Sequence, residues 1–260
     1  MLKNYKKIKD THNERESRNL GIKKAGVKGV AYWGLLNYGK QKIPLQGTID
    51  CFAYLGKNKK GVHMSRIIKF LTRMTGQKIT YNLLKTIALS LCNALETKCV
   101  YLNLHTAAIR IKESPLSKNI GFEEFKIHFL LKAQNGNFSG AIKIGFIGTS
   151  LCPASRDNSK YGAHNQRSLV TVKFPVENVN KIYNYLEISE NQLSAKLYPI
   201  IKLEDEILIT QQAYKNAKFA EDIVRDIAIN LKRNALPYFK ITCENFESIH
   251  THNVYAEIVE

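Results

Sequence analysis

The sequence predicts an α+β fold built from two similar halves in tandem. Some segments alternate apolar and polar residues, which is typical of strands, and others carry apolar residues at helical spacing. The order strand, strand, helix, helix, strand, strand occurs once in the first half of the chain and more loosely in the second. A duplicated module of this kind favours a shared sheet covered by helices.

The elements of the first half are expected in the order ββααββ. Strands are predicted at 28–37, 44–55, 99–112 and 123–134, and helices at 63–73 and 81–96. Thr80 precedes the second helix and is of a residue type that caps helix N-termini.

The second half repeats the same order. Strands are predicted at 140–149, 168–174, 238–244 and 253–259, and helices around 177–189 and 218–233. The turn residues Asn-Gly-Asn at 135–137 lie at the join. We therefore expect a polar N-terminal arm at 1–26, a first half at 27–135 and a second half at 136–260. Strand edges left open would favour closure by oligomerisation.

Composition narrows the class of protein. The 260 residues are 44% hydrophobic and 23% charged, as in ordinary globular proteins. No apolar run approaches the ~18 residues that span a bilayer, and the charged start has no secretory core, so we expect a cytoplasmic protein. Five cysteines without zinc-finger spacing indicate reduced thiols.

The net charge of +17 favours anionic partners such as nucleotides, nucleic acid or acidic surfaces. The lysines are scattered along the chain, and neither an arginine-rich arm nor an aromatic RNA-binding motif accompanies them. Nucleic acid is therefore not expected as the partner, although a basic nucleic-acid-binding protein stays open as an alternative.

The segment 148–167, GTSLCPASRDNSKYGAHNQR, is predicted to be a loop of about twenty residues between two strands. Loops of that length in compact domains are usually functional. Cys152 and His164 lie in it, and cysteine, histidine and a carboxylate together form a common catalytic metal set. The pair alone is weak evidence, because a lone cysteine or histidine in a loop more often has a structural role.

Several carboxylates and histidines follow downstream. Glu204, Asp205, Glu206, Glu221 and Asp222 are acidic residues of the kind that also begin helices, so spacing selects none of them. In the stretch at 243–257, Glu247 and His250 would converge on one ligand in a turn, whereas on a strand they would face apart.

The segment GVHMSR at 61–66 is predicted to begin a helix, which places His63 and Arg66 on one helix face. Helix N-termini favour anions, and an arginine nearby would help to hold phosphate. An ordinary polar first turn explains the same residues. The sequence has no glycine-rich phosphate loop, so a triphosphate would have to be held by side chains.

Together these motifs resemble one family, the type IB GTP cyclohydrolases of bacteria and their archaeal relatives. The resemblance runs from about Val27 to Ala256 and rests on matches in the family's order. The matches are GVKG at 26–29, HMSR at 63–66, TSLCP at 149–153, YGAHNQR at 161–167, the DE pair at 205–206, AYKNAKFAEDIVRD at 213–226 and ENFESIHTHNVYA at 244–256.

The resemblance implies a tunnelling fold in which two ββααββ halves per chain join their sheets into a barrel in a homotetramer, with sites between subunits. It implies one divalent metal per site, with zinc, manganese or ferrous iron as candidates. The metal ligands would be Cys152, His164 and Glu206. Cys152, His63, Glu247 and His250 would be catalytic, and Glu221, Arg66 and Arg167 would bind the substrate.

The implied reaction is hydrolysis of GTP at guanine C8, which releases formate and gives 7,8-dihydroneopterin triphosphate for folate-type pterins; an archaeal-type relative would give a cyclic phosphate. A metal-activated water, histidines that transfer protons and a carboxylate that holds the guanine edge fit this chemistry.

One position departs from the family pattern. Members often read CPCS where this chain has Cys152-Pro153-Ala154-Ser155, and an alanine cannot transfer a proton as the second cysteine has been proposed to do. A paralogue that binds metal and GTP without turnover is therefore an alternative. A cysteine-nucleophile nitrile reductase or a pterin synthase-like enzyme on the same fold are others.

Overall fold

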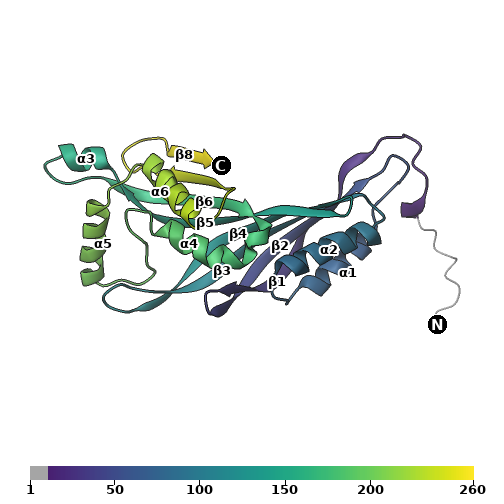
Figure 1. Cartoon of the computed structure of the whole chain (residues 1–260), viewed down its shortest axis with the longest axis horizontal. Helices are drawn as coiled ribbons and strands as arrows, with labels where there is room; N and C mark the ends of the chain where they lie inside the picture. Colours follow the sequence, from purple (N-terminus) through teal and green to yellow (C-terminus); the bar gives the residue numbers. More distant parts are fainter. Residues whose placement is uncertain (1–10) are drawn as a thin grey trace.

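The computed structural model describes residues 11–260. Its strands form one eight-stranded antiparallel sheet in which every strand pairs with the next along the chain (Figure 1). The strands are β1 (Ile22–Tyr38), β2 (Gln41–Leu55), β3 (Cys99–Glu113), β4 (Ile120–Gln134), β5 (Asn137–Leu151), β6 (Asn165–Pro175), β7 (Lys240–Asn245) and β8 (Val254–Val259). The helices are α1 (Met64–Met74), α2 (Tyr81–Ala94), α3 (Pro153–Asn158), α4 (Ile182–Glu190), α5 (Leu203–Lys215) and α6 (Ala220–Arg233), with short 3-10 turns η1 (Thr11–Asn13) and η2 (Val176–Lys181).

The mixed class of helices and strands is confirmed, and most of the predicted strands and helices are present with small shifts of their ends. The helix predicted around 177–189 is divided into the 3-10 turn η2 and α4. The join expected at 135–137 is the turn between β4 and β5, where Asn135 and Gly136 both have positive φ angles, as a two-residue hairpin turn requires. Strand β1 begins at Ile22, inside the arm expected at 1–26, and residues 1–10 of that arm lie outside the described residues.

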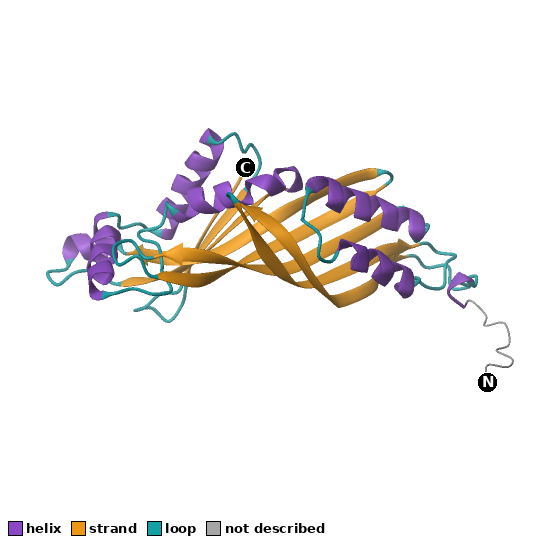
Figure 2. Cartoon of the chain, turned by 90° about the horizontal axis from the view of Figure 1, so that it is seen from below, coloured by secondary structure: helices purple, strands orange, loops and turns teal. Residues whose placement is uncertain are grey.

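The hydrophobic core lies between one face of the sheet and the long helices (Figure 2). Ile127, Ile144, Val172 and Ile241 are register partners on β4, β5, β6 and β7, and all four are fully buried. Their chain neighbours point to the opposite face, because side chains alternate along a strand. We call that opposite side the helix-free face.

Helix α2 shows how the sequence covers the core face. Its buried residues recur at helical spacing, and the side-chain oxygen of Thr80 accepts a hydrogen bond from the Leu83 amide, which confirms the predicted cap. Helix α6 likewise buries its apolar stripe against β7 and β8. The start of α6 is thereby fixed beside the ends of the strands that carry the candidate site.

The prediction of a long loop at 148–167 is wrong, because the loop is shorter. Strand β5 continues to Leu151 and β6 begins at Asn165, with Thr149 opposite Arg167 in the ladder. The small polar residues Gly148, Thr149 and Ser150 lack the alternation of a strand, but their backbone groups pair with β6. The connection is therefore confined to 152–164, and part of it forms α3.

Helix α5 was not predicted, because it lacks an apolar stripe. Only Asp205 and Ala213 are buried along it, and Leu203 is 70% exposed. The Asp205 carboxylate accepts hydrogen bonds from the amides of Leu116 and Ser117 in the β3–β4 connection, at 2.8 and 3.1 Å, and from the amide of Lys202 at 3.0 Å. These bonds hold the pKa of Asp205 well below its usual range although burial acts in the opposite direction. One carboxylate thus fixes the first turn of α5 to the sheet.

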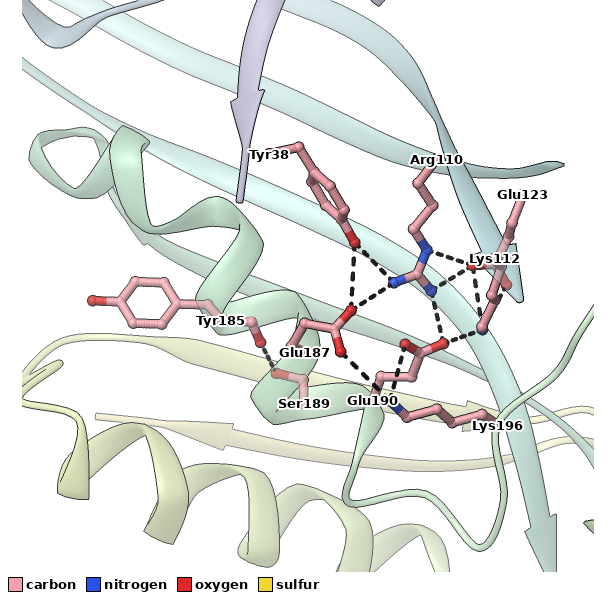
Figure 3. A network of polar contacts seen from close by, with 9 residues as sticks. All are labelled: Tyr38, Arg110, Lys112, Glu123, Tyr185, Glu187, Ser189, Glu190 and Lys196. Atoms are coloured by element: carbon pink, nitrogen blue, oxygen red, sulfur yellow. Dashed lines mark hydrogen bonds and ion pairs between the residues drawn. The ribbon is translucent and has the colours of Figure 1, made fainter. Parts of the chain in front are cut away.

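A buried ion network joins the end of β3 to the end of α4 (Figure 3). Arg110 is 3% exposed and binds Glu190 at 2.7 Å, Glu187 at 3.2 Å and the hydroxyl of Tyr38 at 3.0 Å. Its Nε also donates to Glu123 at 2.6 Å. Lys112 contacts Glu190 as well, so β1, β3, β4 and α4 meet at one charged cluster.

Burial opposes the charged forms in this network, but the opposite charges prevail. The carboxylate of Glu190 raises the pKa of Arg110, and the cations of Arg110 and Lys112 lower the pKa of Glu190. A cavity of about 380 Å³ lies over the network, and most of the charged groups that line it, such as Lys196 and Glu187, are paired with each other. The network therefore has a structural role.

Two further expectations concern the chain as a whole. None of the five cysteines, all within the described residues, forms a disulfide, as predicted. Burial raises the pKa of the Cys51 and Cys243 thiols to about 12, as expected for core residues. Across residues 11–260 there is no helix of the length and apolar character needed to cross a membrane.

Candidate metal and substrate site

A cavity of about 240 Å³ opens where β5, β6 and β7 end beside the start of α6. Its lining includes a thiol, two imidazoles, two carboxylates and an amide, from Cys152, His164, His250, Glu221, Glu247 and Gln166. These groups come from three segments that are far apart in the sequence. The sheet brings them together because β6 lies between β5 and β7.

Cys152 and His164 stand at the two ends of the connection between β5 and β6. The Cys152 amide donates to the His164 carbonyl at 3.1 Å, which closes the connection at its base. The Cys152 sulfur, at the start of α3, accepts a hydrogen bond from the Ser155 amide at 3.5 Å. The eleven intervening residues thus leave both side chains at one cavity.

Gln166 orients the ring of His164. The Gln166 Oε1 atom lies 2.9 Å from His164 Nδ1, and Gln166 Nε2 donates to the Ser150 hydroxyl at 2.8 Å. With its amide nitrogen engaged by Ser150, Gln166 offers only an acceptor to the ring, so Nδ1 carries the proton. The lone pair of His164 then lies on Nε2, the form in which a histidine binds a metal.

Glu247 brings a carboxylate to the same place. Its Oε2 atom is buried, lies 3.8 Å from His164 Nδ1 and has no hydrogen-bond partner among the described residues. Buried carboxylate oxygens normally have a hydrogen bond, so this oxygen is available to a ligand. His250 stands 6.5 Å from His164 between ring centroids and stacks on His252. Residues 246–253 form the turn between β7 and β8, the arrangement in which Glu247 and His250 converge.

The start of α6 forms another side of the cavity. Glu221 lies in the first turn of this helix and is exposed within the single chain. Lys218 precedes it, and its amide donates to the Leu151 carbonyl while its ammonium binds Asp226 at 2.8 Å. Lys218 therefore ties α6 to the end of β5, next to Cys152.

Four of the predicted residues, Glu206, Arg167, His63 and Arg66, do not line the cavity. Glu206 is exposed on α5, and Arg167 is exposed on the helix-free face of β6. Within residues 11–260 of one chain, no three histidine, cysteine or acidic side chains are grouped closely enough to hold a metal ion. The donor types at the cavity fit a catalytic metal site, whereas the full ligand set of Cys152, His164 and Glu206 stays a prediction.

His63 and Arg66 lie at the opposite end of the sheet. His63 precedes α1, its ring is 5.3 Å from that of His12, and Arg66 donates to the Ala94 carbonyl at 3.1 Å. Strand β5 separates this region from Cys152, and its 15 residues span about 50 Å. Figure 1 shows α1 and α3 at opposite ends of the molecule. Within one chain, therefore, the structure does not bring these two residues to the cavity.

Sequence reasoning gave no role to Gln166 or Asn245, both of which line the cavity. Asn245 is 3% exposed and accepts the Ser168 hydroxyl at 2.7 Å, which fixes the end of β7 against β6. For Gln166 the only local signal is its place two residues after His164, at the start of β6. For Asn245 the partner lies 77 residues away, and no local pattern indicates it.

Comparisons with known proteins show the family of this chain. A family model described as type I GTP cyclohydrolase FolE2 matches residues 8–256. The chain is 33% identical to the GTP cyclohydrolase FolE2 of Thermotoga neapolitana over 253 residues, and 33% identical to that of Thermotoga maritima over 255 residues, with 96% of both chains covered in each case. It is 34% identical to the protein of that name from Syntrophotalea carbinolica, covering 96% of this chain and 94% of the relative. The chain belongs to the type I GTP cyclohydrolase FolE2 family.

Proposed function

We propose that this chain is a GTP cyclohydrolase that hydrolyses GTP at guanine C8, releases formate and forms 7,8-dihydroneopterin triphosphate. The observation that carries the proposal is the cavity that joins Cys152, His164 and Glu247, whose Oε2 atom has no hydrogen bond, to the start of α6. Family membership supports the same reaction, because the matched relatives carry the name GTP cyclohydrolase. Family membership therefore favours an active enzyme over a paralogue that binds metal and GTP without turnover.

The residues of the cavity divide into three tasks. Glu221 accepts hydrogen bonds from N1–H and the 2-amino group of guanine, which fixes the base with C8 toward Cys152 and His164. His250 transfers protons to the imidazole nitrogens as the ring opens. Glu247 accepts a proton on its free Oε2 atom beside His164.

One divalent ion, zinc, manganese or ferrous iron, is proposed to bind Cys152 and His164 at the cavity, with Glu206 as the third ligand. When bound, such an ion supplies an activated water for the attack on C8 at neutral pH. The thiol and the free Nε2 of His164 are the donor types that such ions prefer. Glu206 does not line the cavity within one chain, so movement of α5 or another subunit must bring a Glu206 side chain to Cys152 and His164.

The proposed assembly is a homotetramer of tunnelling folds, in which the sheets of neighbouring chains close into a barrel. The distance of about 50 Å along β5 supports it, because His63 and Arg66 can complete the cavity only from another chain. Co-expression of His63→Ala with Cys152→Ala chains tests the arrangement. Mixed assemblies contain some intact sites, so they should regain part of the activity that each variant lacks alone. No recovery in assembled mixtures would show that the two residues act at separate sites.

The experiment that tests the reaction uses protein reconstituted anaerobically with Zn²⁺, Mn²⁺ or Fe²⁺ and then incubated with GTP. Formate release together with the fluorescence of the oxidised pterin is expected with at least one metal. Loaded protein that releases no formate with any metal would refute the proposal for this chain.

Ala154 is the position to test next. It lies in the first turn of α3, is exposed, and its carbonyl accepts the Asn158 side chain at 2.9 Å. Ala154→Cys introduces the second cysteine without disturbing that bond. We expect the natural chain to be active and the variant to be at most moderately faster. A chain that turns over only as Ala154→Cys would show that proton transfer depends on this thiol.

A further inference from the structure

A row of basic side chains crosses five neighbouring strands on the helix-free face. His105 on β3 is opposite His128 on β4, and His128 is opposite Lys143 on β5. Lys143 is in turn opposite Lys173 on β6, and Lys173 is opposite Lys240 on β7. We call these five residues the basic row. Side chains directly opposite each other lie about 5 Å apart, so the row contains five basic groups in succession without an acid between them.

The ends of the basic row have counter-charges, whereas its centre has none. Asp50 lies 3.6 Å from His105, and Glu257 binds Lys240 at 2.7 Å. Lys143 and Lys173 are exposed, and no carboxylate of residues 11–260 lies within 4.0 Å of either ammonium. The centre of the helix-free face is therefore an uncompensated positive region.

Such a row is unfavourable for the sheet itself. Like charges directly opposite each other destabilise a strand pair, and here three lysines stand side by side on β5, β6 and β7. The effect reaches His128, whose pKa is lowered by burial and by the positive charges of its neighbours, including Lys143. An anion bound across Lys143 and Lys173 would remove this repulsion.

The surface beside the two central lysines leaves room for such an anion. Gly145 is opposite Lys126 on one side and Thr171 on the other. A Cβ atom at Gly145 would meet both neighbours at 3.8 Å, an ordinary contact, so packing does not require glycine there. Its missing side chain leaves a gap on the helix-free face, next to the Lys143–Lys173 pair. The methyl group of Thr171 faces this gap, while the Thr171 hydroxyl is paired with that of Thr242 at 2.6 Å.

We propose that the centre of the basic row is a binding site for a linear polyphosphate anion, held across Lys143 and Lys173 in the gap at Gly145. Lysine ammonium groups are common phosphate ligands, and a chain of phosphoryl groups presents successive charges to successive strands. The site is separate from the proposed GTP cavity. Arg167 stands near the cavity end of β6, and Lys173 lies six residues farther along, a distance of about 20 Å.

Calorimetric titration of the intact protein with inorganic tripolyphosphate tests the site. The double variant Lys143→Gln/Lys173→Gln should bind about tenfold more weakly or worse, because two charge-assisted contacts are lost. The matched control is Lys69→Gln/Lys85→Gln, which removes the same charge from exposed positions on α1 and α2. All these proteins keep the cavity, so chelation of a bound metal by tripolyphosphate affects them equally. The proposal would be overturned if Lys143→Gln/Lys173→Gln bound tripolyphosphate as tightly as the natural chain. It would also be overturned if the control variant lost the same affinity.

A charge reversal separates binding from structural damage. Lys173→Glu places an acid between Lys143 and Lys240, so the opposing pairs become attractive. We expect the urea midpoint of this variant to rise while its affinity for tripolyphosphate is lost. Retained affinity would contradict the proposal whatever the midpoint.

Competition distinguishes two sources of the anion, a nucleotide and an inorganic polyphosphate. The competition is measured in the Glu221→Ala variant, because this variant lacks the proposed guanine anchor. Displacement of tripolyphosphate by GTP would identify the nucleotide's triphosphate chain as a ligand of the row, and no displacement would restrict the site to inorganic polyphosphate. Formate release at saturating GTP should be unchanged in Lys143→Gln/Lys173→Gln. The tripolyphosphate titration does not require turnover, so it tests this site even if the chain releases no formate from GTP.

Discussion

At the residue scale, the orientation of His164 depends on one neighbour. The Gln166 Oε1 atom accepts a hydrogen bond from His164 Nδ1, and the Gln166 amide nitrogen donates one to the buried hydroxyl of Ser150. Histidines that bind metals in proteins usually have such a partner on the other ring nitrogen, which fixes the tautomer and the direction of the ring. Gln166 therefore acts through His164 and is a positioning residue.

Gln166→Ala should weaken metal binding by about 10- to 100-fold, because the ring of His164 loses its fixed tautomer. Competition with a chromogenic chelator measures the affinity. Gln166→Glu keeps an acceptor for Nδ1–H and should recover most of it. The matched control is Gln46→Ala, on β2 outside the cavity, which should leave the metal affinity unchanged. An affinity unchanged in Gln166→Ala would show that His164 is held by other contacts.

Glu221 provides the second prediction at this scale. Glu221→Ala should weaken binding of GTP by about tenfold or more, because two hydrogen bonds from the guanine edge to a carboxylate are lost. Metal binding should be unchanged, since Cys152 and His164 are untouched. Equilibrium binding of GTP and of ATP to both proteins tests this. A variant that loses affinity for both nucleotides equally would contradict a role in reading guanine.

At the element scale, α5 is held by a polar anchor in place of an apolar stripe. The carboxylate of Asp205 binds three backbone amides, two of which belong to the β3–β4 connection. Glu206, the predicted third metal ligand, is the next residue. The position of that side chain therefore depends on the bond between α5 and the sheet.

Asp205→Ala should release the first turn of α5. Amide hydrogen exchange is expected to become faster in two segments at once, 202–208 and 114–119, because both lose the same acceptor. The matched control is Glu204→Ala, which removes an exposed acid from the same turn and should leave both segments protected. Faster exchange in only one segment would show that the anchor does not couple α5 to the sheet.

At the scale of the whole molecule, the two halves predicted from the sequence share one sheet and one charged cluster. The row of Ile127, Ile144, Val172 and Ile241 runs from β4 to β7 across the join. The buried network of Arg110 and Glu190 connects β3 in the first half with α4 in the second. Removal of one partner from such a network leaves the other charge buried, which is costly.

Glu190→Gln should lower the free energy of unfolding at pH 7 by about 3 kcal/mol. Arg110 and Lys112 depress the pKa of Glu190 below its ordinary value of 4.5, so its contribution is present above that value and is lost as the pH falls below it. The difference between natural and variant chains should therefore shrink in acid, as urea unfolding at pH 7 and pH 3 would measure. The control, Glu113→Gln, breaks an exposed ion pair with Lys118 and should cost less than about 1 kcal/mol. A constant difference at both pH values would contradict the assigned charge of Glu190.

The sequence by itself determined the order of strands and helices, because alternation and helical spacing are local and the covered segments are strongly amphipathic. It also indicated Cys152, His164, Glu221, Glu247 and His250 through motifs in a recognisable order, and these five side chains line one cavity. Tertiary structure alone decided the features that depend on distant partners. Helix α5 is held by an acid that binds a connection 88 residues away, and β5 extends into a predicted loop because β6 pairs with it. The basic row exists only in the register of five strands, since each of its lysines and histidines is unremarkable in its own segment.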